Sequence, residues 1–142
     1  MLNVIRLVAL GLWTGALAGF AFFFAPIAFA HVGPTPAFAG MIAACVLALA
    51  RFGWLLGGIA VAATIFDRGA APLAARISTL AVILAIGLSI VEVVGILPQM
   101  QNTPLGTPAY DALHRQSGLV YGLALLSALN ALVASSWRPV YR

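Results

Sequence analysis

The sequence ISTLAVILAIGLSIVEVVGIL, residues 77–97, decides the fold. Glu92 is its one charged residue, and most of the others are apolar. A membrane-spanning helix needs about 20 mostly apolar residues, because each residue adds about 1.5 Å and the hydrocarbon core of a bilayer is about 30 Å thick. The stretch meets this requirement and therefore predicts a helix that crosses a membrane.

Three further stretches of the same character lie before and after it, at about residues 4–30, 37–66 and 108–134. Turn-forming residues separate the four stretches; they are Gly33, Pro34 and Pro36, then Gly69 and Pro72, then Pro98, Pro104 and Gly106. Thr107 before Pro108 predicts a helix N-cap followed by proline at the first helical position. The chain is therefore predicted to be all-α, a single transmembrane domain of residues 1–142 folded as a polytopic four-helix bundle.

The first stretch has an alternative interpretation as a secretory signal, because Ala28-Phe29-Ala30 resembles a small-residue cleavage site. A signal core has about 7 to 15 apolar residues, and this run is longer. We therefore expect the stretch to be a retained membrane helix.

The composition excludes several classes of function. Hydrophobic residues make up 63% of the chain and charged residues only 7%, with a net charge of +4. The basic residues form no cluster that could follow a phosphate backbone, so we expect membrane lipid as the surroundings and no nucleic-acid partner. Cys45 is the single cysteine, which excludes an internal disulfide and a cysteine-based metal site.

The distribution of arginine predicts the orientation, since cytoplasmic loops carry an excess of Lys and Arg. With four spans, one side of the membrane carries Arg6, Arg68, Arg76, Arg138 and Arg142. The opposite side has Arg115 and, depending on its depth, Arg51. Both termini are therefore expected in the cytoplasm, for a protein of the bacterial inner membrane.

Small residues predict how the helices associate, because in lipid close backbone packing replaces the hydrophobic driving force. Glycines recur at four-residue spacing within three of the four stretches; they are Gly11, Gly15 and Gly19, then Gly53 and Gly57, then Gly118 and Gly122. We expect them to serve helix packing within the bundle.

Arg51 and Glu92 are the charges that a membrane ought to exclude, because an unpaired charge at the bilayer centre costs about 2.5 to 3.5 kcal/mol. The second stretch is about 45 Å long if continuous, and we expect it to project on the outer side. Its outermost part, residues 37–46, would then stand above the membrane. That placement brings Arg51 level with Glu92 and predicts an ion pair inside the bundle, either as a structural clamp or as part of a ligand or ion pathway.

A polar stripe opens the fourth stretch. Its members lie on one helical face; they are Tyr110, His114, Ser117 and Tyr121. His31 ends the first stretch on the same outer side. An alternative interpretation therefore makes His31 and His114 ligands of a metal ion or a haem. No HExxH, cysteine/histidine cluster, glycine-rich phosphate loop or nucleophile elbow occurs, and no enzymatic activity is expected.

The chain resembles a family of small four-helix membrane proteins related to transmembrane protein 205, a domain family of unknown function. The likeness rests on Trp13-Thr14-Gly15, Ala25-Pro26, Phe29 and Ala39-Gly40, and above all on residues 110–117, YDALHRQS, which match the pattern aromatic-x-x-Leu-His-x-x-Ser. Tyr110 stands where the family more often has Phe. The resemblance implies a shared feature of Pro26, His114 and Ser117 on the outer side, and export or drug resistance has been suggested for some members.

The sequence thus predicts a non-enzymatic inner-membrane protein with a polar cluster near the periplasmic side. The cluster consists of Arg51, Glu92, His31, His114, Tyr110 and Ser117, and it would bind or pass a small molecule or ion. One alternative is a small accessory subunit that docks on a larger membrane complex, or a homo-oligomer. The other alternative is a membrane haem or metal-binding protein.

Overall fold

The computed structural model describes residues 1–67 and 72–137, and these form four long helical rods with no strand. The first rod comprises α1 (Leu2–Gly19), a π-helical turn η1 (Phe20–Phe24) and α2 (Ala25–Val32). The second is α3 (Pro36–Phe66). The third comprises α4 (Pro72–Ile90), the π-helical turn η2 (Val91–Ile96) and α5 (Leu97–Gln101), and the fourth is α6 (Pro108–Ser136). All four are long and apolar enough to cross a membrane, which confirms the predicted all-α class and the number of spans.

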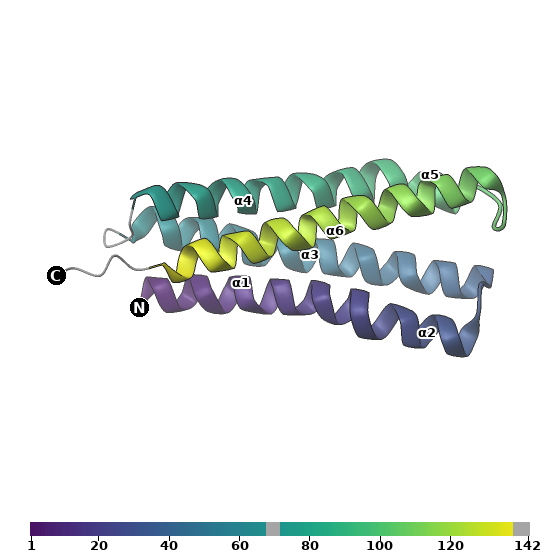
Figure 1. The fold of residues 1–142 in the computed structure, drawn as a ribbon, viewed down its shortest axis with the longest axis horizontal. Coiled ribbons are helices and arrows are strands. Elements are labelled where there is room, and N and C mark those ends of the chain that lie inside the picture. Colours follow the sequence, from purple (N-terminus) through teal and green to yellow (C-terminus); the bar gives the residue numbers. More distant parts are fainter. Residues whose placement is uncertain (68–71, 138–142) are drawn as a thin grey trace.

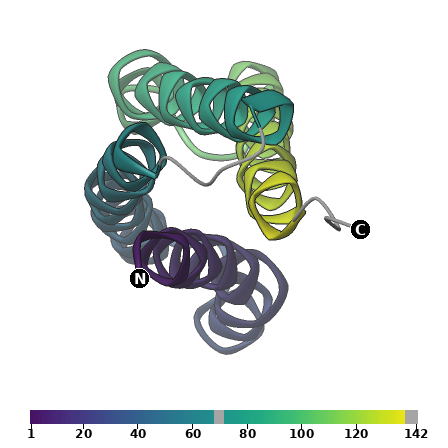
Figure 2. The same cartoon turned by 90° about the vertical axis from the view of Figure 1, so that its left-hand side faces the viewer.

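The rods run side by side in a bundle (Figure 1). Viewed from one end, α1 lies next to α3 and α6, and α4 completes the ring between α3 and α6 (Figure 2). The start of α1 and the end of α6 lie at the same end of the bundle, which we call the terminal end. The turn after α2 and the loop after α5 lie at the opposite end, which we call the loop end.

The four rods have nearly equal lengths of 29 to 31 residues, or about 45 Å. The second helix is as long as expected, 31 residues without a break through Arg51, but the other three rods are nearly as long. The third helix starts at Pro72 and not near residue 77, and it continues past Pro98 to Gln101. Each rod exceeds a hydrocarbon core of about 30 Å by a similar amount, so the overhang belongs to the whole bundle.

Two prolines explain the π-helical turns. Pro26 and Pro98 each stand two residues after a π turn, inside a rod that stays helical. A proline in a helix has no N–H to donate, and its ring collides with the carbonyl four residues earlier. Widening the preceding turn relieves that collision. Pro98 therefore distorts the third helix, whereas the sequence predicted that it ends there.

Side-chain caps fix the starts of α3 and α6 at the loop end. Thr107 Oγ1 accepts a hydrogen bond from Tyr110 N at 3.2 Å, which confirms the predicted N-cap. Thr35 Oγ1 does the same for Phe38 N at 3.1 Å. In both cases a proline occupies the next position, where its missing N–H is no loss.

The core is built from alanine and glycine around one large side chain, Trp13. Its indole is only 2% exposed, and Leu10, Ala85, Ala128 and Ala131 around it are fully buried. A Cβ built on Gly53 would overlap the Trp13 indole, and one on Gly57 would lie 3.1 Å from the same ring. A Cβ added at any of the other five glycines of the predicted stripes would meet no atom within 4 Å; they are Gly11, Gly15, Gly19, Gly118 and Gly122. Only Gly53 and Gly57 therefore act as close packing positions within a single chain.

A polar cluster ties three helices together at the terminal end. Arg6 is 5% exposed, and its Nη2 donates to Asn3 Oδ1 at 2.6 Å and to Ser135 O at 3.2 Å. Ser135 is in the last turn of α6, where free carbonyls and the negative end of the helix dipole favour a cation. Ser78 on α4 joins the cluster through Ser135 Oγ at 2.7 Å. The arginine that the sequence placed among cytoplasmic surface charges is thus a buried cap for another helix.

Replacing Gly53 with alanine is expected to destabilise the bundle by about 1 to 3 kcal/mol, the usual cost of inserting a methyl group into a filled core. The new Cβ would lie 2.6 Å from Trp13 Cε2, so the buried indole would have to shift from its packed position. Thermal unfolding of the purified protein in detergent measures the effect. Gly58→Ala is the matched control, because a Cβ there meets nothing within 4 Å. Equal melting temperatures for the two variants would contradict the close contact.

Candidate functional site

Glu92 is a buried carboxylate within the membrane-spanning part of the bundle. It lies on η2 and is 3% exposed. Ser117 of α6 donates a hydrogen bond to Glu92 Oε1 at 2.6 Å. The second oxygen, Oε2, is buried and has no hydrogen-bond partner among the described residues. A buried polar atom of this kind is costly in a low-dielectric interior, and it identifies the candidate site.

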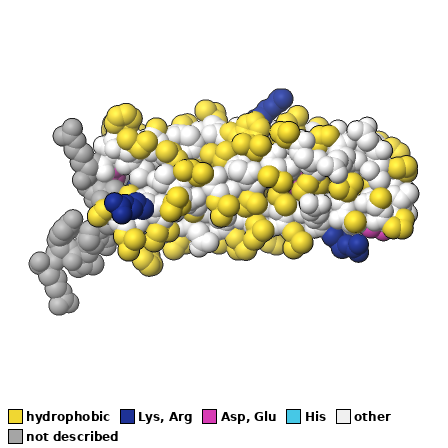
Figure 3. Space-filling model, turned by 90° about the horizontal axis from the view of Figure 1, so that it is seen from above, with side chains coloured by type: hydrophobic (Ala, Val, Ile, Leu, Met, Phe, Trp, Pro, Cys, Tyr) yellow, Lys and Arg dark blue, Asp and Glu magenta, His cyan; other side chains and the backbone are white. Residues whose placement is uncertain are grey.

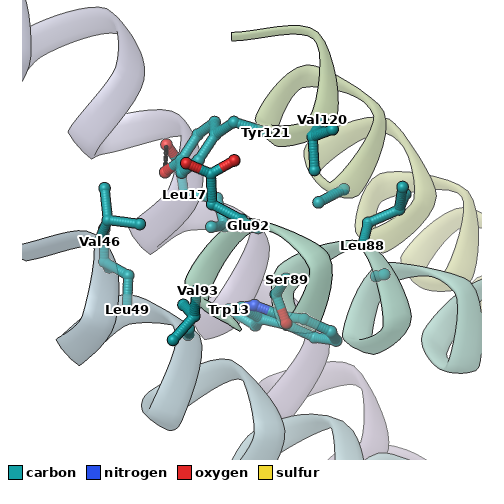
Figure 4. A pocket seen from close by; sticks show the side chains of 13 residues that line it. Trp13, Leu17, Val46, Leu49, Leu88, Ser89, Glu92, Val93, Val120 and Tyr121 are labelled. Atoms are coloured by element: carbon teal, nitrogen blue, oxygen red, sulfur yellow. Dashed lines mark hydrogen bonds between the residues drawn. The ribbon is translucent and has the colours of Figure 1, made fainter. Parts of the chain in front are cut away.

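A narrow cavity lies beside the carboxylate, and all four rods line it. Trp13 and Leu17 come from α1, Val46 and Leu49 from α3, and Tyr121 from α6. Figure 4 shows the carboxylate of Glu92 pointing into this space on the side where Tyr121 lies. The cavity has a volume of about 20 Å³, and one water molecule needs a cavity of about 10 to 15 Å³. It therefore has room for a ligand of about the size of water.

The two hydroxyl groups on the cavity wall, those of Tyr121 and Ser89, already have backbone partners. Tyr121 donates its hydroxyl proton to Leu17 O at 2.9 Å, just before the first π turn. Ser89 donates to Ile86 O at 2.8 Å and accepts from Trp54 Nε1 at 2.6 Å. Glu92 Oε2 is thus the lining oxygen that is left without a hydrogen bond.

The polar stripe of α6 leads from the loop end toward Glu92. Tyr110 and His114 stack with ring centroids 6.3 Å apart and 7° between their planes. His114 is exposed and stands three residues before Ser117 on the same face of α6. Tyr110 also lines a wider cleft of about 510 Å³ between the start of α3 and the loop that follows α5. The structure thus pairs Tyr110 with His114 and Ser117 with Glu92 along one face of α6.

Arg51 does not belong to this region, and the expected ion pair with Glu92 is not formed. Its side chain is exposed on the outside of α3, while the neighbouring Ala50 and Gly53 face the core. It is also deeper: Arg51 is 15 residues from the start of α3, whereas Glu92 is nine residues from the end of α5. At about 1.5 Å per residue, their depths differ by about 9 Å. The level placement failed because it ended the third helix at Leu97, whereas that helix continues to Gln101.

His31 is also separate from the Glu92 region. It is exposed at the end of α2, and its Nδ1 donates to Ile27 O of the same helix at 2.8 Å. Figures 1 and 2 show α2 and the first turns of α6 on different sides of the bundle. Within residues 1–67 and 72–137, no group of three or more His, Cys, Asp or Glu side chains could hold a metal ion.

Several residues of the site are absent from the sequence-based cluster. Trp13, Ser89 and Tyr121 line the cavity or orient its walls, but only Tyr121 carried a signal, its place on the polar stripe. Pro26 and Pro98 gave a second signal, since a proline inside a long apolar run predicts a distorted turn just before it. Nothing in the sequence marks Trp13 or Ser89 as cavity residues.

In comparisons with known proteins, no protein-family model, curated protein or solved structure matches this chain.

Replacing Ser117 with alanine is expected to lower the stability of the folded protein by about 1.5 to 3 kcal/mol, the usual contribution of a hydrogen bond to a charged group. The substitution leaves both oxygens of the buried Glu92 carboxylate without a partner. Thermal unfolding in detergent gives the measurement. Ser136→Ala is the control, because Ser136 is exposed and donates only to Val133 O of its own helix. A Ser117 variant as stable as the Ser136 variant would show that the hydrogen bond does not support the carboxylate.

Proposed function

We propose that this protein is a non-enzymatic integral membrane protein of the bacterial inner membrane that binds a small polar ligand or ion at Glu92. The observation that carries the proposal is the unpartnered Oε2 of a carboxylate that is 3% exposed and lines a water-sized cavity. Ionisable residues inside membrane-spanning segments mark ligand and ion pathways. Two other buried polar atoms lack a partner among the described residues, Arg6 Nε and Thr14 Oγ1, but neither residue lines the cavity.

The proposed orientation places both termini in the cytoplasm and the loop end in the periplasm. Arg6 and Arg76 lie toward the terminal end, and Arg115 lies toward the loop end. Three further arginines that support the assignment, Arg68, Arg138 and Arg142, lie outside the described residues. In this orientation Glu92 is about 14 Å from the outer end of its rod, and so lies in the outer half of the bundle. The resemblance to the transmembrane protein 205 family agrees with this proposal through His114 and Ser117.

Replacing Glu92 with glutamine is expected to abolish the dependence of stability on the ligand. The wild-type protein in detergent should change its melting temperature with pH or with one of Li⁺, Na⁺, K⁺ and NH₄⁺ at constant ionic strength. A ligand at 100 times its Kd stabilises by about 2.7 kcal/mol, which is readily detected. The glutamine variant keeps an oxygen that can accept the Ser117 hydrogen bond, so the expected loss concerns the ligand and not the fold.

Asp111→Asn is the control for that experiment, since Asp111 is an exposed acid in the first turn of α6. It should retain the wild-type response in every condition. If Glu92→Gln responds as the wild type does to all the cations and across the whole pH series, Glu92 is no binding site.

A second candidate function, an accessory subunit that docks on a larger membrane protein, is favoured by Arg51. This residue is the midpoint of α3, exposed on the outside and without a hydrogen bond or ion pair to any described residue. Leu55 is a large exposed side chain on the same face, but most of the exposed residues there are small, as close helix packing requires; they are Ala44, Ala48, Gly58 and Ala62. Figure 3 shows apolar side chains along the flank of the bundle and a basic side chain projecting midway along it.

An arginine in this position requires an acidic partner at the same depth. If the bundle is centred in the bilayer, Arg51 lies about 15 Å from either surface of the hydrocarbon core, so its side chain has difficulty reaching lipid headgroups. A second copy of the chain offers no matching acid, because Glu92 is buried and Asp67 and Asp111 lie at helix ends. The partner of this face would be a helix of another protein with a carboxylate near its centre.

A probe helix tests this docking face. A membrane-spanning Leu/Ala peptide with one central Asp should bind the reconstituted wild-type protein at least about tenfold more tightly than it binds Arg51→Gln, a difference of about 1.4 kcal/mol. Energy transfer between a labelled peptide and a fluorophore at the protein's C-terminus reports binding in vesicles. Arg76→Gln, which removes an exposed charge near a helix end, is the control. Equal binding of the Asp peptide and an all-apolar peptide would rule out the charge-directed contact.

A further inference from the structure

We infer that the Glu92 site is a proton-binding site that exchanges protons with the outer aqueous side by way of His114. This inference rests on the proposed function, since it names the ligand of the same site. Three observations carry it: the size of the cavity, the number of available oxygen ligands, and the line of polar groups between the loop end and the carboxylate.

The size of the cavity excludes most ligands that a carboxylate attracts. The volume is about 20 Å³, and the walls are close-packed apolar side chains such as Leu17, Val46 and Val120. A drug-sized organic cation would need a site of about 300 Å³ or more. By size, what fits is a proton, alone or with a single water molecule, or a small bare cation.

The oxygen atoms available around the cavity favour a proton over a metal cation as the ligand. Hard metal cations are held by several oxygen ligands at once. Around this cavity the hydroxyls of Ser89 and Tyr121 are engaged with backbone carbonyls, and Ser117 is engaged with Oε1. Glu92 Oε2 is the carboxylate oxygen without a hydrogen bond, and one of its lone pairs is enough to bind a proton. A metal cation would have to complete its ligand shell with the neutral hydroxyl oxygens of Ser89 and Tyr121.

The route to Oε2 follows one face of α6. At the loop end, the wide cleft is lined by Tyr110, whose ring stacks on His114. His114 is exposed and stands three residues before Ser117 on the same face of α6. One turn farther along, Ser117 contacts the carboxylate directly. Histidine exchanges protons with water near neutral pH, so His114 is suited to collect a proton and to pass it inward.

Few ionisable groups lie around Glu92, so few residues take part when it gains or loses a proton. From α6, His114 and Tyr121 are the titratable groups near the carboxylate. The residues that α1 and α3 contribute to the cavity wall are uncharged, and Arg51 of α3 is exposed on the outside of the bundle. A proton taken from outer water binds to Oε2, converting the carboxylate to a neutral carboxyl, while Ser117 continues to donate to Oε1. Release reverses the step, and no other bond is made or broken.

Infrared spectroscopy of the full chain in an ester-free detergent tests the inference, because the C=O stretch of a protonated carboxyl is separate from the carboxylate bands. The chain has only three acids, Asp67, Glu92 and Asp111. We expect a carboxyl band that appears as the pH is lowered and is absent in Glu92→Gln. On transfer to deuterium oxide, this band should shift at least about tenfold more slowly in His114→Gln than in the wild type, since a positioned acid–base group accelerates proton transfer by about 10² to 10⁴.

His31→Gln is the matched control, because His31 is the other histidine of the chain and lies on α2 away from Glu92. It should exchange at the wild-type rate, and equal rates in the wild type and His114→Gln would overturn the route. A Glu92 band that never changes with pH would overturn proton binding. If one of the metal or ammonium ions still stabilises the wild type but not Glu92→Gln, the binding site stands and only its assignment to protons fails. If neither ions nor pH distinguish the two, both proposals fail.

Discussion

The structure depends on one constraint: in lipid, every backbone N–H and C=O must find its hydrogen-bond partner within the protein. Four uninterrupted rods satisfy nearly all of them internally. Backbone hydrogen bonding is hardest to maintain near Pro26 and Pro98. There the helix widens into π turns and does not break. A side chain from another rod assists at the first of these places, where the Tyr121 hydroxyl donates to Leu17 O. The second π turn carries Glu92, so the same distortion that preserves the helix also aims the carboxylate at the bundle centre.

The second element of the architecture is close approach between helices. Since burying apolar surface brings little benefit in lipid, van der Waals packing and a few polar contacts must hold the rods together. Alanine and glycine permit this around Trp13, and hydrogen-bonded serines join α4 to α6 and α6 to η2. Among the described residues, one polar cluster surrounds Arg6 and another surrounds Glu92, and each keeps a buried atom without a hydrogen bond, Arg6 Nε in the first and Glu92 Oε2 in the second.

The fold could be predicted from the sequence to a large extent, and the site only in part. Length and hydropathy specify four spans, and Thr107 and Pro108 mark the start of the last one. The polar face of α6 follows from helical spacing. The orientation of Arg51 did not follow, because a helix that is apolar all round gives no indication of which side faces its neighbours. The burial of Arg6 was equally hidden, since it depends on where the far end of α6 meets α1. Contacts between two rods join residues that are far apart in the sequence, and the periodicity of a single rod does not predict them.

The first rod contributes to the core over only part of its length, and this affects which of its residues can be substituted. α1 contributes Leu10, Trp13 and Leu17 to the interior, whereas η1 and α2 have no buried residue at all. The packed interior of the first rod therefore ends at Leu17. Substitutions in η1 and α2 remove no buried side chain, so this segment can vary in sequence while the packing around Trp13 is kept.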